Sequence, residues 1–345
     1  MLYVTTRNGA DTHTAHQALQ GSLTSDGGLY IPFRLPRIST EILMQMRSNS
    51  MSETVAQILN MFFPAKFTAA DVAECAGFDS ARLVGMSHKI ILAELWNSNS
   101  YILDSVSLAF QNKILGTSRE ESISDWAKIC CRIAYLFGIY GMLLAKNLAD
   151  GVRALDLAVV SDDFSAPMAA WYAREMGLPI GMIICGCEDN SDVWDLLHRK
   201  ELHCNCNTTP AGLERLIYGV FGQQDAQRFA DACRSNKLYT APLDTEEELG
   251  QGIFAAVVSN RRVDAVIRNV FNTNAYVLSP SAALAFGGLQ DYRATCGDST
   301  PALILADQSP LASSQFVAES LGITISALEK MLQQQGGNYG SVRNR

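Results

Sequence analysis

Two cysteine clusters offer the clearest metal-binding chemistry in the 345-residue sequence: the pair Cys185 and Cys187, and the group His203, Cys204 and Cys206. Thiolate and imidazole groups are ligands that zinc prefers, although the spacing within each pair is shorter than zinc sites usually have. The first pair also falls at the end of an expected strand, where small thiols pack well in a core. We therefore expect core or loop thiols here, with a zinc site or a redox disulfide as the alternatives.

The histidines and serines form no familiar catalytic motif. The sequence contains five histidines but neither a His-Glu-x-x-His pair nor a Gly-x-Ser-x-Gly elbow. His198 is followed by Arg199 and Lys200, a pattern typical of a solvated helix end. We expect the histidines to be surface or hydrogen-bonded side chains.

The elements that must position these residues alternate between strand and helix. A strand over 155–160, a helix over about 166–176 and a strand over 178–185 have the spacing of a parallel pair joined by a right-handed crossover. The mostly apolar stretch 124–145 predicts a long buried helix. The sequence therefore predicts an α/β fold with a central, mostly parallel sheet after a largely helical N-terminal region. Other expected elements are strands at 90–96 and 302–306 and helices at 211–221, 226–236, 246–260, 262–271, 279–294 and 313–321.

Composition excludes several classes of protein. Hydrophobic residues make up 48% and charged residues 18%, which excludes a disordered chain or a charge-dense fibre. With 35 acidic and 27 basic residues the net charge is -8, and no run of Lys or Arg offers a nucleic-acid surface. The most apolar window, 133–145, is too short to cross a bilayer, and the N-terminus does not read as a secretory signal. We expect a cytoplasmic protein with reduced cysteines that binds neither nucleic acid nor membrane.

A more specific signal comes from several stretches that occur in a fixed order. Together they resemble the threonine synthase family, pyridoxal-phosphate (PLP) enzymes of fold type II that convert phosphohomoserine to threonine. The resemblance runs from residue 1 to about 325 and implies a tryptophan-synthase-β-like fold. The stretches that carry it are Tyr3-Val4-Thr5-Thr6-Arg7, 17–21, Asp26-Gly27-Gly28-Leu29-Tyr30-Ile31-Pro32, 121–127, 133–137, 172–180, Leu213-Glu214-Arg215-Leu216-Ile217 and 276–286.

The sequence departs from this family at the Schiff-base position. In the family a lysine there condenses with PLP, but an ungapped alignment places Asp104 at that position and a gapped one places Gln111. Neither side chain can form an imine, because only an amine condenses with the aldehyde. Lys113 is the nearest amine, two positions beyond Gln111.

The phosphate-binding loop departs in the same way. Asp162, Asp163, Phe164 and Ser165 stand where the family has a glycine-rich turn. Two unit charges about 4 Å apart repel each other by roughly 4 kcal/mol at an effective dielectric of about 20, so these carboxylates disfavour a phosphate. We expect Asp162, Asp163 or Ser165 to cap a helix instead. The resemblance also implies that Asp307 takes the position facing the pyridine nitrogen, and that PLP binding is lost.

The family's mobile small domain is missing between Leu115 and Glu121. A piece of about 100 residues, the size of a domain, is absent at this point. We expect a threonine-synthase-like N-terminal domain over 1–90, a reduced PLP-fold large domain over 91–330 and a flexible tail over 331–345.

Two functions follow from this pattern. The first is an inactive pseudoenzyme that binds no PLP and acts as a scaffold for a small metabolite or a protein. Its partner would be a second copy or a true threonine synthase, because loss of the small domain exposes apolar surface. The alternative is a divergent threonine synthase, a PLP-dependent phospho-lyase acting on O-phosphohomoserine, or an enzyme with new chemistry in the old cleft.

Overall fold

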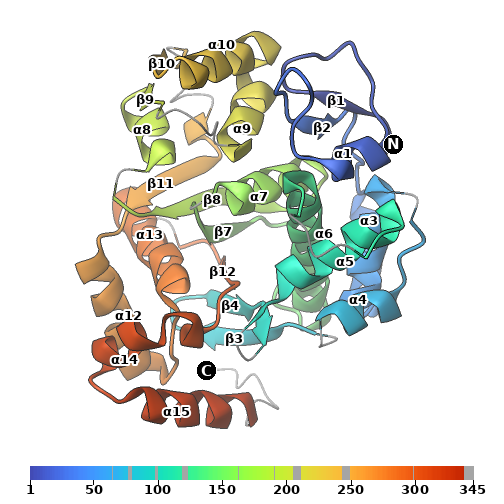
Figure 1. Cartoon of the computed structure of the whole chain (residues 1–345). Coiled ribbons are helices and arrows are strands. Elements are labelled where there is room, and N and C mark those ends of the chain that lie inside the picture. The colour runs from blue at the N-terminus through green and yellow to red at the C-terminus, as the bar shows by residue number, and fades with distance from the viewer. Residues whose placement is uncertain are drawn as a thin grey trace.

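A six-stranded sheet forms the centre of the protein (Figure 1). The computed structural model describes residues 1–63, 65–76, 80–97, 100–118, 123–161, 163–189, 191–204, 211–242, 249–297 and 299–337. The strand order is β11-β8-β7-β12-β4-β3, and every neighbouring pair is parallel except β3 with β4. The strands are β3 (Arg82–Met86), β4 (Ile90–Glu94), β7 (Leu155–Val160), β8 (Ile180–Cys187), β11 (Ile253–Val257) and β12 (Ala302–Ala306).

Helices cover both faces of this sheet, so its central strands are apolar on both sides. On β7, Leu157 and Val159 pack into the core beneath α6 (Asp125–Ala145) and α7 (Ser165–Glu175). Ala158, between them, belongs to the opposite core beneath α12 (Asn260–Asn274) and α13 (Pro280–Cys296). The expected α/β architecture with a mostly parallel sheet is therefore present.

Helix α13 approaches β8 closely because two glycines face each other. A Cβ atom at Gly186 would lie 2.3 Å from the carbonyl oxygen of Leu284, and one at Gly288 would lie 3.1 Å from the Cα of Gly186. Only glycine allows the backbones to come this near. This contact fixes the carboxyl end of β8 and the turn that follows it.

The N-terminal region packs against the large helix α6. A Cβ atom at Gly138 of α6 would lie 2.9 Å from the side chain of Met51, at the start of α3 (Met51–Phe62). Strand β3 precedes residue 90 yet pairs with β4, so the expected domain boundary at 90 divides a β-hairpin. The other elements of this region are β1 (Tyr3–Thr5), α1 (Ala15–Gln20), β2 (Tyr30–Pro32), α2 (Thr40–Gln45), a 3-10 turn (Met46–Ser48), α4 (Ala69–Ala76), β5 (Trp96–Asn97), β6 (Ser100–Tyr101) and α5 (Ile102–Leu115).

A smaller layer of helices follows β8, and two short helices close the chain. Residues 331–337, which we expected in a flexible tail, continue the last helix; residues 338–345 lie outside the described part. These elements are α8 (Asp192–His198), β9 (Glu201–His203), α9 (Ala211–Phe221), α10 (Gln223–Arg234), β10 (Leu238–Thr240), a 3-10 turn (Pro310–Ser313), α14 (Ser314–Leu321) and α15 (Ile325–Gly337).

Two sequence expectations need correction. The helix expected over 246–260 is wrong, because residues 253–257 form strand β11 and 243–248 lie outside the described residues. A short apolar run of this kind is compatible with a buried strand or a buried helix. The second correction concerns the 13-residue apolar window, which belongs to the 21-residue helix α6. By length and composition alone this helix could cross a membrane, but 83% of its apolar stretch is buried within the protein.

Candidate functional site

The two candidate Schiff-base positions lie on α5. Asp104 is in the first turn of this helix. Gln111 is buried, and its Oε1 accepts a hydrogen bond of 2.8 Å from the backbone N–H of Ser124, the N-cap residue of α6. Gln111 therefore fastens α5 to the start of α6.

Lys113 of α5 pairs with a residue of α4. Its Nζ lies 2.7 Å from Oδ2 of Asp71 and 5.2 Å from the ring centre of Phe67. The hydrogen bond from Lys113 is the largest cause that lowers the pKa of Asp71 to about 2. The nearest amine in the sequence is thus held by a partner on a neighbouring helix.

Asp163 caps the helix that would hold the phosphate. Its Oδ1 accepts hydrogen bonds from the backbone N–H of Ser165 at 2.9 Å and from the Ser165 hydroxyl, while Phe164 adopts a left-handed conformation with φ 59°. Desolvation raises the pKa of Asp163, but these bonds and the charges of Arg132 and Lys128 outweigh it, so the pKa lies below its ordinary value. The N-cap residue itself is Phe164, which makes no side-chain cap hydrogen bond; Asp163, one residue earlier, bonds the first N–H of the helix instead. Asp162 lies outside the described residues.

Asp307, which the resemblance places opposite the pyridine nitrogen, forms an ion pair. Nη1 of Arg132, from α6, lies 3.2 Å from Oδ2 of Asp307, which follows β12. The space left beside this pair measures about 20 Å³, enough for about one water molecule. It is bounded by Leu95, Leu103, Leu136, Val159, Val160, Ala166 and Leu305.

These residues do not fit PLP. A carboxylate already occupies the N-terminus of α7, the residue expected to face the pyridine nitrogen is bonded to Arg132, and Asp104 and Gln111 are not amines. The charges of Asp163, Arg132 and Asp307 are already bonded within the protein, where a bound cofactor would otherwise contact them.

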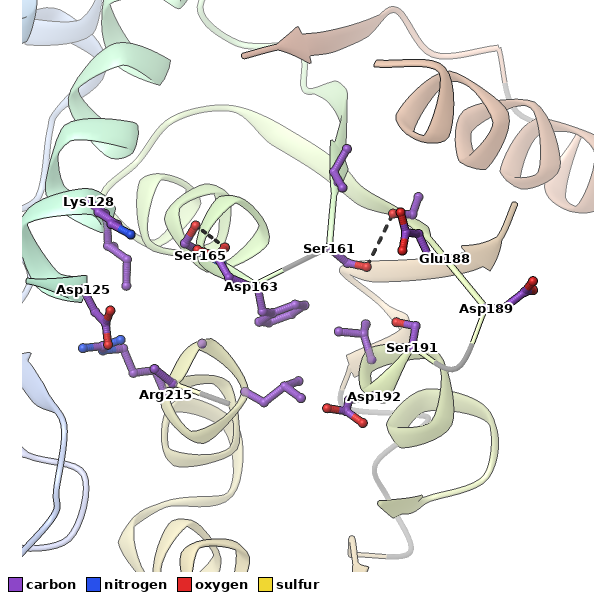
Figure 2. Close-up of a pocket in the computed structure, with 18 residues that line it drawn as sticks. Asp125, Lys128, Ser161, Asp163, Ser165, Glu188, Asp189, Ser191, Asp192 and Arg215 are labelled. Atoms are coloured by element: carbon purple, nitrogen blue, oxygen red, sulfur yellow. Dashed lines mark hydrogen bonds between the residues drawn. The ribbon is translucent and has the colours of Figure 1, made fainter. Parts of the chain in front are cut away.

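A larger cavity of about 390 Å³ lies on another side of the α7 N-terminus (Figure 2). Gly212 shapes it, because a Cβ atom there would lie 2.8 Å from the carbonyl oxygen of Phe164, so α9 begins directly against the β7–α7 turn. Carboxylates outnumber cations in its lining. The charged residues are Asp125, Lys128, Asp163, Glu188, Asp189, Asp192 and Arg215.

Arg215 is the buried charge of this cavity, with an exposed fraction of 1%. Its Nε donates to the carbonyl of Tyr30 at 3.3 Å, but Nη1 and Nη2 are buried without a hydrogen-bond partner. The Asp125 carboxylate lies beside the guanidinium in Figure 2 and offsets part of its charge. Burial nevertheless lowers the pKa of Arg215.

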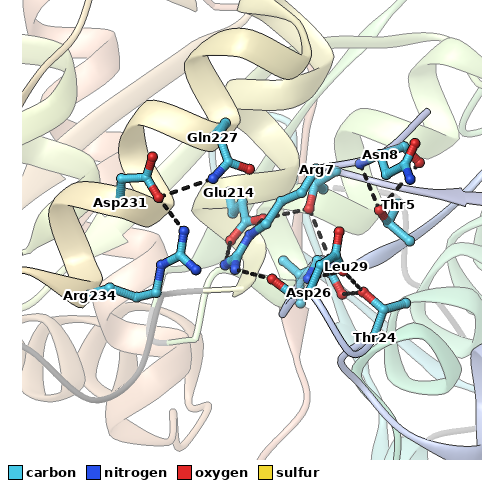
Figure 3. A network of polar contacts seen from close by, with 12 residues as sticks. Thr5, Arg7, Asn8, Thr24, Asp26, Leu29, Glu214, Gln227, Asp231 and Arg234 are labelled. Atoms are coloured by element: carbon cyan, nitrogen blue, oxygen red, sulfur yellow. Dashed lines mark hydrogen bonds and ion pairs between the residues drawn. The ribbon is translucent and has the colours of Figure 1, made fainter. Parts of the chain in front are cut away.

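A buried ion pair fixes the helix that carries Arg215 (Figure 3). Arg7 donates through Nη2 to Oε2 of Glu214 at 3.0 Å and through Nε to Oε1 at 3.2 Å. The hydroxyl of Thr6 also donates to Oε1. Because Glu214 precedes Arg215, this bidentate contact sets the rotation of α9 and presents Arg215 to the cavity.

The described cysteines of the two clusters are not assembled around a metal. Cys185 and Cys187 are buried in β8, where burial raises the pKa of both thiols. His203 ends β9, and Cys204 instead contacts Cys233 of α10. No group of three or more metal-ligating side chains occurs in the described part of the chain, and Cys206 lies outside it.

Sequence reasoning missed the roles of Arg132, Lys128 and Arg215. Residues 213–217 carried part of the family resemblance. Only the fold shows that the Arg215 guanidinium is buried and that Arg215 lines a cavity. Arg132 precedes the apolar window of α6, and its pairing with Asp307 joins residues far apart in the sequence.

The fold and this degenerate site define the class: a fold-type II PLP scaffold. The chain is similar to a threonine synthase from Brucella melitensis solved with PLP bound, at 18% identity, with a TM-score of 0.79 and coverage of 96% of this chain and 94% of that one. A threonine synthase from yeast gives 16% identity, the same TM-score and the same coverage. The expected fold class is therefore confirmed.

Sequence comparisons give similarity to one family over part of the chain. Residues 2–77 match the family described as "Threonine synthase N terminus". The human protein "Threonine synthase-like 1" is 23% identical over 176 residues, 47% of this chain and 24% of that protein, so the match spans about a quarter of that relative. Threonine synthase from Pseudomonas aeruginosa is 23% identical over 215 residues, 58% of this chain and 43% of that enzyme. The chain is thus similar to threonine synthases and threonine synthase-like proteins over part of its sequence, and its fold is that of the solved threonine synthases.

Proposed function

We propose that this threonine synthase-like chain has lost PLP chemistry and binds a small metabolite in the 390 Å³ cavity. The ion pair between Arg132 and Asp307 carries the proposal, because Asp307, the residue that the resemblance places opposite the pyridine nitrogen, is already bonded to Arg132. The two side chains are partly buried, at 15% and 22% exposure, so a ligand that separated them would leave each charge without its partner. Asp163 supports the same conclusion, since its carboxylate already uses the anion-binding end of α7.

Lys128 is the amine that a test must address. It lines the larger cavity and its positive charge helps to lower the pKa of Asp163. An ammonium group beside a carboxylate is a poor nucleophile, because Schiff-base lysines must lose their proton before they attack an aldehyde. The alternative function, an enzyme with new chemistry in the former PLP cleft, would depend on Lys128.

The test is an absorbance spectrum of the purified protein incubated with excess PLP, before and after borohydride reduction. We expect no internal-aldimine band and no single reduced pyridoxyl adduct in the peptide map. Lys128→Ala and the surface control Lys113→Ala should then match the unmodified protein. A band that borohydride removes, that Lys128→Ala abolishes and that Lys113→Ala leaves intact would overturn the proposal.

A further inference from the structure

The thiols of Cys204 and Cys233 are in contact although they come from different elements. Each forms a side-chain hydrogen bond with the other, and both are free thiols. Cys204 follows β9, and Cys233 is the last residue but one of α10. Two sulfurs that meet across a fold can join in a covalent bond when an oxidant takes up two electrons.

Backbone pairing explains why the two thiols meet. Strand β9 is antiparallel to β10, with His203 opposite Leu238, so Cys204 lies beside the turn that leads into β10. In this turn the backbone N–H of Lys237 donates to the carbonyl of Ala232 at 2.9 Å, which folds the start of β10 back against the end of α10. The strand pairing and the turn therefore hold the two sulfurs together.

The two thiols differ in their access to solvent. Cys233 is 4% exposed, whereas Cys204 is half-buried. A small uncharged oxidant such as hydrogen peroxide therefore reaches Cys204 first.

They also differ in acidity. Burial raises the pKa of both thiols. Hydrogen bonds from the Cys233 thiol and from the backbone N–H of Tyr239 lower the pKa of Cys204 in part, whereas the bond to Cys204 raises the pKa of Cys233 further. Cys204 therefore loses its proton more readily, and the thiolate is the form of cysteine that attacks an oxidant.

We propose that Cys204 and Cys233 form a reversible disulfide when the protein meets hydrogen peroxide. The Cys204 sulfur attacks one peroxide oxygen, the O–O bond breaks, one water leaves and a sulfenic acid remains on Cys204. The Cys233 sulfur then attacks the Cys204 sulfur, the S–O bond breaks and a second water leaves. The two thiols lose two protons and two electrons, and the peroxide is reduced to two molecules of water.

The disulfide acts on the helix between the two cysteines. The loop that it closes, from residue 204 to residue 233, contains α9 and most of α10. Ala211, Gly212 and Leu213, at the start of α9, line the large cavity. Oxidation therefore restrains this wall of the cavity and, because it also restricts the unfolded chain, stabilises the fold. The proposal does not depend on the proposed function, since it requires no ligand in the cavity.

Mass spectrometry of the full chain tests the proposal. The reduced protein is treated with hydrogen peroxide, its remaining thiols are blocked, and it is digested without reductant. We expect one cross-linked pair of peptides, which joins Cys204 to Cys233, weighs two hydrogen atoms less than its parts and separates in dithiothreitol. No cross-link, or a bond from Cys204 to Cys206, would overturn the proposal.

Variants separate the roles of the two sulfurs. Cys233→Ser should leave the sulfenic acid on Cys204, where dimedone labels it, whereas Cys204→Ser should leave Cys233 unlabelled. Cys296→Ser is the matched control, because it removes an exposed cysteine outside the pair, and its cross-link should form as in the unmodified protein. Label on Cys233 instead of Cys204 would contradict the proposed order of attack. If a variant does not fold, the cross-link in the unmodified protein still decides.

Urea denaturation supplies a second measurement. The oxidised protein should unfold at a higher urea concentration than the same protein after dithiothreitol, and Cys204→Ser should show no such difference. An unchanged or lower midpoint for the oxidised protein would mean that the bond forms only in a distorted chain, which would also overturn the proposal.

Discussion

At the scale of single residues, the charged groups at the degenerate site bond to other groups of the protein. Asp163 provides an anion at the N-terminus of α7, and Arg132 pairs with Asp307. The capping role of Asp163 could be predicted from the sequence, because it depends on residues next to one another. The roles of Arg132 and Arg215 could not, since their partners and surroundings come from distant segments.

Replacing Asp163 with alanine should lower the free energy of unfolding by about 1 kcal/mol at pH 7, the usual loss for an N-terminal cap. The folded state lowers the pKa of Asp163, so its stabilisation is fully present above the unfolded pKa, about 3.9, and is lost as pH falls below it. Urea titrations of both proteins between about pH 7 and pH 3 measure this difference.

Asp163→Asn is the matched control for that prediction. Asparagine keeps an oxygen that accepts from the Ser165 N–H but has no charge, so its loss of stability at pH 7 should be smaller than that of Asp163→Ala. Its loss should also shrink as pH falls, because the wild-type carboxylate is then protonated. A deficit in Asp163→Ala that stays constant down to pH 3 would contradict the electrostatic part of the argument.

At the scale of elements, the sequence predicted the crossover units well because strand, helix and turn signals repeat there. It failed at β11, whose five residues are apolar on both faces and lack the alternation that marks a half-buried strand. The close packing of α13 on β8 was equally invisible, because it depends on Gly186 and Gly288 facing each other across two elements.

Gly186→Ala should therefore lower the free energy of unfolding by about 1–3 kcal/mol or more, because the new methyl group meets the backbone of Leu284. Gly85→Ala is the control, since Gly85 also lies inside a strand, β3, but a Cβ atom there has no neighbour within 4 Å. Urea denaturation followed by far-ultraviolet circular dichroism compares the two. Equal effects of both substitutions would show that close packing at β8 is not what Gly186 provides.

At the scale of the whole molecule, the N-terminal region and the central sheet share a buried core. One buried apolar cluster runs from Tyr3 through α6 to Leu303, and β3 completes the central sheet. Nine residues, 116–124, join α5 to α6, so no domain lies between them. Association with a second copy or with a threonine synthase stays a prediction.

The buried pair between Arg7 and Glu214 tests whether the N-terminal region belongs to the same folding unit. Both side chains are almost fully buried, at 5% and 0% exposure, and they join the segment that follows β1 to α9 (Figure 3). Arg7→Ala strands the Glu214 carboxylate and should cost about 3–5 kcal/mol. Removing that charge as well, in Arg7→Ala with Glu214→Gln, should recover part of the loss.

Because the core is continuous, unfolding of Arg7→Ala should remain a single transition in which fluorescence and far-ultraviolet circular dichroism coincide. Arg234→Ala breaks the exposed pair with Asp231, also visible in Figure 3, and should cost no more than about 1 kcal/mol. Two separate transitions in Arg7→Ala would mean that residues 1–90 fold independently. A single transition shifted to lower urea would instead show that the N-terminal segment and α9 unfold as one unit.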